Sequence, residues 1–118
     1  MGPASLAPHS ARPKNPAETV AEMSTLLEEI HALIEAPAVE RAHVERTLTD
    51  GYAHALNLEV NGLRLQKRVE ALTGDLHHEE SRESAKELKV LAKQLDGNAG
   101  ELSTLRSVLA QLRRRIRT

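Results

Sequence analysis

The amino-acid sequence predicts an all-α protein, a long antiparallel helical hairpin of the coiled-coil kind with a shorter third helix on its N-terminal side. Large aliphatic residues recur at alternating steps of three and four over residues 20–72 and again over 88–116, which is the spacing of one helix face. The chain has no Phe or Trp and one Tyr, so it lacks the aromatic side chains that usually fill a thick globular core. Thin aliphatic contacts between helices fit this composition.

The 118 residues are enough for one domain, which we expect over residues 17–118. Four of the five prolines lie in residues 1–16, and this stretch shows no apolar periodicity. We expect it to be a disordered N-terminal arm.

The three predicted helices span residues 17–36, 38–73 and 76–117. Asn15 can cap the first helix and Pro16 suits its first turn. Pro37 predicts a tight corner, because proline inside a helix costs about 3 kcal/mol but can open a new one. Gly74 and Asp75 predict the turn of the hairpin.

Two Asp-Gly pairs, Asp50-Gly51 and Asp96-Gly97, are turn signals inside the predicted helices. The apolar pattern crosses both pairs without a change of phase, whereas a real turn usually resets it. We therefore predict that both helices continue, with a break or kink over residues 96–100 as the alternative.

The hairpin has two plausible registers. A short turn at residues 74 and 75 pairs residues whose numbers add to about 150 and places Gly51 opposite Asn98. We prefer this register because small residues then face large ones. The alternative, with numbers adding to about 157, has a longer loop through residues 77–81 and is favoured by a capping pattern at residues 84–87.

Composition excludes several classes of protein. With no Cys, the chain has no disulfide framework, thiol catalysis or thiolate metal site. No apolar run approaches the roughly 18 residues of a spanning helix, and the N-terminus shows no signal-peptide stretch, so we expect a soluble cytoplasmic protein. No phosphate-binding loop, nucleophile elbow or zinc-protease motif is present. We expect no enzyme activity and no cofactor.

Glu-x-x-His occurs twice, as Glu28 with His31 and Glu40 with His43. Such pairs hold the metals of di-iron helical bundles when they point into the core. On a helix, both pairs lie to the side of the line of apolar residues that faces the core, so we expect no metal site. A metal-dependent oxidase is the least favoured alternative.

The basic cluster Arg113-Arg114-Arg115-Ile116-Arg117 lies near the C-terminus and could contact the phosphates of nucleic acid, which makes a nucleic-acid-binding protein the main alternative. The net charge of −1 and the lack of stacking aromatics argue against it. Cations at a helix C-terminus also interact favourably with the helix dipole.

The most prominent pattern is a closing ladder of aliphatic residues. We expect it to mediate self-association, with a dimer favoured, or docking of a partner helix, with Arg113, Arg114 and Arg115 setting orientation against glutamate-rich surfaces. The predicted function is thus a non-enzymatic assembly or adaptor protein. The ladder residues are Leu102, Leu105, Leu109, Leu112 and Ile116.

Overall fold

The structure, a computed structural model, describes residues 16–78 and 82–117, with side-chain surroundings for 21–74 and 82–117. The predicted all-α class is confirmed, and the three helices are α2 (Pro16–Glu35), α3 (Arg41–His78) and α4 (Arg82–Arg114). The predicted N-terminal arm lies outside the described residues, except for Pro16, which is the first residue of α2.

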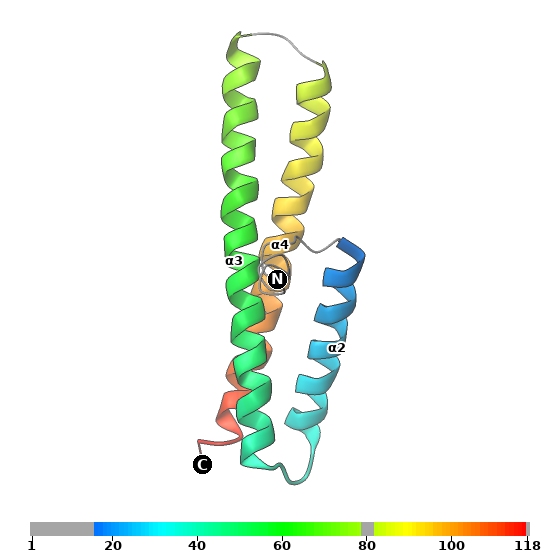
Figure 1. The fold of residues 1–118 in the computed structure, drawn as a ribbon, viewed down its shortest axis with the longest axis vertical. Helices are drawn as coiled ribbons and strands as arrows, with labels where there is room; N and C mark the ends of the chain where they lie inside the picture. Colours follow the sequence, from blue (N-terminus) through cyan, green and yellow to red (C-terminus); the bar gives the residue numbers. More distant parts are fainter. Residues whose placement is uncertain (1–15, 79–81, 118) are drawn as a thin grey trace, which may run out of the picture.

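Helices α3 and α4 form a long antiparallel hairpin, and α2 lies beside one half of it, parallel to α4 (Figure 1). At 1.5 Å per residue, α3 is about 57 Å long and α2 only about 30 Å. The half of the hairpin beside α2, next to the corner between α2 and α3, is called the basal half below. The other half, which ends at the hairpin loop, is called the distal half.

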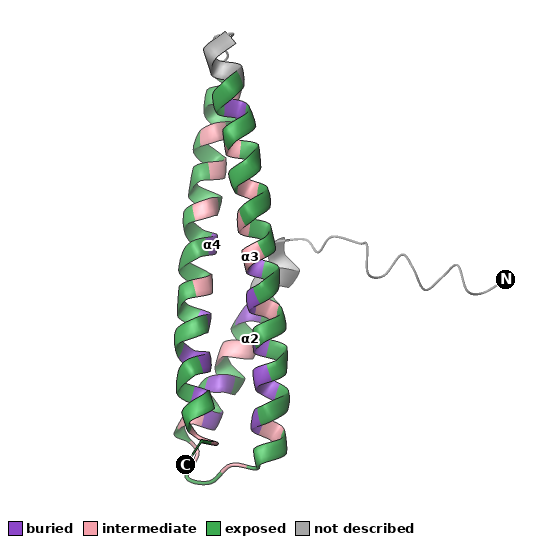
Figure 2. Cartoon of the chain, turned by 90° about the vertical axis from the view of Figure 1, so that its left-hand side faces the viewer, coloured by how far each residue is buried: buried purple, intermediate pink, exposed green. Residues whose placement is uncertain are grey.

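The core is concentrated in the basal half, where three helices enclose it (Figure 2). In the distal half most apolar residues between α3 and α4 are only half-buried, because two helices cannot shield the contact between them from water on both sides, and Leu72 is an exception at 3% exposed. The half-buried distal residues include Leu65, Val69, Leu88, Leu91 and Leu95. The core residues are Met23, Ile30, Leu33, Val44, Leu48, Ala55, Leu58, Leu105, Val108, Leu109 and Leu112.

The predicted corner at Pro37 is confirmed, since α2 ends at Glu35 and α3 begins at Arg41. Both α3 and α4 run without interruption through their Asp-Gly pairs, as the constant phase of the apolar pattern predicted. A helical glycine costs about 1 kcal/mol, which the packing of the surrounding apolar residues outweighs.

The preferred register is wrong. Gly51 lies against Leu109, and Gly62 lies against Asn98, so facing residues have numbers that add to about 160, close to the alternative register. The cause is that α3 does not stop at Gly74 but continues to His78, and α4 starts only at Arg82. Because the loop comes later in the chain, each residue of α3 faces a residue of α4 about ten positions further along than the preferred register predicted.

Asn98 is the buried polar residue of this seam. Its Nδ2 donates a hydrogen bond of 2.8 Å to the carbonyl oxygen of Leu58, and its Oδ1 accepts one of 3.0 Å from Nδ2 of Asn61. The approach is possible because Gly62 has no side chain, and a Cβ there would lie 3.0 Å from Asn98 Nδ2. A buried polar group that finds its partners in only one alignment favours that register.

Replacement of Asn98 by alanine is expected to lower the free energy of unfolding by about 1–2 kcal/mol, because two hydrogen bonds of a buried side chain are lost. Urea unfolding followed by circular dichroism measures the change. The matched control is Asn57→Ala, an exposed position on α3, where the same gain in helix propensity occurs without the loss. Equal stability of the two variants would contradict a structural role for Asn98.

Candidate interaction surface

The structure places the predicted leucine ladder mainly inside the protein. Leu105, Leu109 and Leu112 are at most 1% exposed, in contact with the rest of the core. Leu102 and Ile116 are half-buried at its edge. Three of the five ladder residues are therefore already covered within one chain, and a partner would reach them only if the bundle opened.

The terminal arginines divide into two groups. Arg113 and Arg114 are exposed, whereas Nη2 of Arg115 donates a 2.6 Å hydrogen bond to the carbonyl oxygen of Ala36, just after the end of α2. A cation at this position interacts favourably with the α2 dipole. Arg115 thus holds the end of the chain against the corner between α2 and α3.

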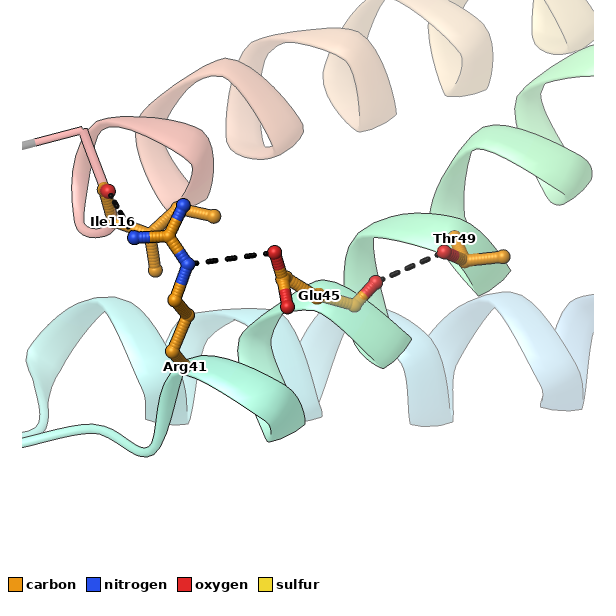
Figure 3. Close-up of polar contacts among 4 residues, drawn as sticks. All are labelled: Arg41, Glu45, Thr49 and Ile116. Carbon is orange, nitrogen blue, oxygen red and sulfur yellow. Dashed lines mark hydrogen bonds and ion pairs between the residues drawn. The ribbon is translucent and has the colours of Figure 1, made fainter.

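A second arginine, Arg41 in the first turn of α3, binds the same C-terminal end of the chain (Figure 3). Nη1 of Arg41 donates to the carbonyl oxygen of Ile116 at 3.3 Å, while its Nε contacts Oε2 of Glu45 at 3.4 Å. The final turn of the chain is therefore held by the first turn of α3.

Of the two Glu-x-x-His pairs, Glu28, His31 and Glu40 are exposed, and His43 is half-buried between α2 and α3. Nε2 of His43 lies 3.3 Å from Oε1 of Glu29, which also accepts a 3.0 Å hydrogen bond from Oγ1 of Thr47. This contact joins α2 to α3. Within residues 21–74 and 82–117, no three His, Asp or Glu side chains gather closely enough to hold a metal ion.

Among the residues whose side-chain surroundings are described, four of the five exposed large apolar side chains lie on α3. Tyr52, Leu56, Val60 and Leu63 are exposed by 46%, 58%, 46% and 61%. Their spacing of four, four and three residues puts them on one side of the helix, and we call them the α3 stripe. Single exposed apolar residues are ordinary, but four in a row on one helix face mark a surface suited to binding.

The α3 stripe faces away from α2. Tyr52 follows His43 by nine residues, and Leu56 follows Thr47 by nine, which at 100° per residue is about two and a half turns. His43 and Thr47 contact Glu29 of α2, so the stripe lies on the opposite side of α3. The hairpin is thus covered by α2 on one side and presents apolar side chains on the other.

A shallow groove between α3 and α4 adjoins the stripe at Leu63. Its apolar wall is formed by Leu58 and Leu63 of α3 and by Leu95 and Leu102 of α4. Arg106 and Glu59 form an ion pair across it, which leaves the groove without an unpaired charge from these two residues. The groove extends the apolar surface from α3 towards α4.

Our sequence reasoning did not identify the α3 stripe, although the signal is present. Tyr52, Leu56, Val60 and Leu63 form a second helical periodicity, turned by about 85° from the line through Leu48 and Ala55. The line of core residues accounts for the amphipathic pattern by itself, so the periodicity alone does not single out the second line.

None of the described helices is long and apolar enough to cross a membrane. Comparison of the chain with protein-family models, with curated proteins and with solved structures gave no match.

Proposed function

We propose that this protein is a non-enzymatic helical assembly module that binds another helix through the α3 stripe. The observation that supports the proposal is the exposure of Tyr52, Leu56, Val60 and Leu63 on one face of α3, opposite the face that α2 covers. A helix bound there would pack on the side of α3 that faces away from α2 and would cover the four apolar side chains with its own apolar face.

The energetic basis is the removal of apolar area from water. Each square ångström of apolar surface buried contributes about 25 cal/mol, and one aromatic and three aliphatic side chains provide a continuous strip of it. The charged residues around the stripe set the orientation of the bound helix. This division differs from the sequence-based hypothesis, in which the closing leucine ladder carried the binding energy.

Replacement of Leu56 by glutamate is expected to abolish the association. Leu56 lies at the middle of the stripe, and a buried carboxylate without a partner is strongly unfavourable in a helix contact. Size-exclusion chromatography coupled to light scattering is the measurement. We expect the wild-type chain to have a mass above that of the monomer and the Leu56→Glu variant to have the monomer mass with unchanged circular dichroism.

The matched control is Asn57→Glu, which adds the same charge at the neighbouring exposed position, about 100° around the helix. It is expected to keep the wild-type mass. A wild-type protein that remains monomeric up to about 1 mM, where association of about 4 kcal/mol is populated, would contradict the proposal. An equal loss of mass in both variants would show that the stripe is not the contact.

A further inference from the structure

The α3 stripe belongs to a longer line of exposed residues that is symmetric about Leu56. Seven positions at offsets of −11, −7, −4, 0, +4, +7 and +11 lie within an arc of about 80° on α3. All seven are exposed, and in order they are Glu45, Thr49, Tyr52, Leu56, Val60, Leu63 and Lys67.

The two ends of this line carry side chains of opposite charge, and Oε2 of the acidic one, Glu45, also contacts Nε of Arg41 in the same chain. Glu45 lies eleven residues before Leu56, and Lys67 lies eleven residues after it. Between them, Tyr52 and Val60 lie four residues on either side of Leu56, so the larger side chain of one copy meets the smaller one of the other, and Thr49 matches Leu63 at the offset of seven. A surface with these properties is complementary to itself when it is turned end to end, which is the requirement of a two-fold symmetric dimer.

We propose that the helix bound by the α3 stripe is α3 of a second copy of this chain, aligned antiparallel around a two-fold axis at Leu56. The inference rests on the proposed function and names its partner. In this dimer, Leu56 contacts the partner's Leu56, and Tyr52 lies against the partner's Val60. Glu45 meets the partner's Lys67 at both ends.

Charge favours the antiparallel alignment over the parallel one. In a parallel pair, Glu45 faces the partner's Glu45 and Lys67 faces the partner's Lys67, so each end carries a repulsion. In the antiparallel pair the same four groups form two attractive contacts. Opposed charges at the edges of a helix pair set orientation in this way.

The length of the contact suits a helix-to-helix dimer. Glu45 and Lys67 are 22 positions apart, which corresponds to about 33 Å of helix. The groove beside Leu63 lies within these 33 Å of α3. In the antiparallel pair the partner's Tyr52 is opposite Val60, which is at the height of this groove along the helix. The single aromatic residue of the sequence thus has an apolar surface to cover in the other copy.

The segment before α2 is poorly suited to the same position. Among residues 1–15 the large aliphatic side chains are Met1 and Leu6. Two such residues, five positions apart, do not match the four-residue apolar line of the stripe. A second copy supplies a line of the required length and chemistry.

Cysteine cross-linking tests the alignment directly, because the chain contains no Cys. A disulfide requires the two Cα atoms to lie within about 7 Å. Under mild oxidation, the Leu56→Cys variant is expected to form a disulfide-linked dimer with itself. The Glu45→Cys variant is expected not to, because its two copies lie about 33 Å apart. A mixture of Glu45→Cys and Lys67→Cys chains is expected to give the mixed dimer.

Charge exchange provides a second measurement that needs no oxidation. Glu45→Lys alone and Lys67→Glu alone are each expected to weaken the dimer by about tenfold, since each creates two like-charge contacts. The double variant is expected to recover the wild-type dissociation constant. Recovery in the double variant supports the pairing, and additive weakening overturns it.

The outcomes separate this inference from the proposed function. A dimer that Leu56→Glu dissociates, but in which Glu45→Cys links to itself, overturns the antiparallel alignment and leaves the assembly function standing. A wild-type monomer contradicts both. A dimer with the expected cross-links supports both.

Discussion

Replacement of Leu105 by alanine is expected to lower the free energy of unfolding by about 2–5 kcal/mol, the usual range for a Leu→Ala change in a core. Leu105 is fully buried where α2, α3 and α4 meet, so the truncation leaves a cavity that three packed helices cannot close. Chemical denaturation of the variant and the wild type at the same protein concentration measures the difference.

The matched control is Leu56→Ala on the α3 stripe, where the same atoms are removed from a side chain that is 58% exposed. We expect it to change the unfolding of the isolated fold by less than about 1 kcal/mol and to weaken association instead. The pair of variants therefore distinguishes the two apolar lines, the internal ladder and the exposed stripe. The opposite result, with a stable Leu105→Ala protein that no longer associates, would restore the ladder as the interaction surface.

Replacement of Gly51 by alanine is expected to destabilise the protein, although alanine is the better helix former. A Cβ at residue 51 would lie 2.3 Å from Cδ2 of Leu109 and 3.3 Å from its Cδ1 and Cγ. Leu109 is 1% exposed and held by its neighbours, so its side chain has little room to move away. Overpacking of this kind typically costs about 1–3 kcal/mol, which exceeds the gain of up to about 1 kcal/mol in helix propensity.

Gly97→Ala gives the comparison at a second helical glycine. Apart from its chain neighbours and the nearby backbone of its own helix, no atom lies within 4 Å of a Cβ built there, so the substitution adds only helix propensity and reduces the freedom of the unfolded chain. We expect a stabilisation of about 0.5–1 kcal/mol, seen as a higher melting temperature in a thermal scan. Substitution effects of the same sign at residues 51 and 97 would contradict the close contact between Gly51 and Leu109.

The helices themselves were predictable because helix signals are local. Pro16 marks the first turn of α2, Pro37 falls in the corner, and the three-four spacing continues through Gly51 and Gly97 in phase. Each of these signals depends on residues within a few turns of one another. The end of α3 was misplaced for the same reason, since Gly74 is a local stop signal that the long helix overrides.

The candidate site was less predictable. The ladder from Leu102 to Ile116 has the same spacing whether it is buried by its own chain or by a partner, and periodicity does not distinguish the two cases. The spacing of the α3 stripe can also be found in the sequence, but only the position of α2 shows that nothing in the described chain covers it.

The sequence by itself therefore determined the all-α class, the corner and the continuity of the helices, since these depend on backbone preferences and on apolar spacing along one segment. Only the tertiary structure decided which residues face each other and which apolar line remains exposed. The contacts of Leu109 with Gly51 and of Asn98 with Gly62 join residues that are far apart in the chain. Their fit depends on the shape of two helix surfaces together, which the pattern of either helix alone does not contain.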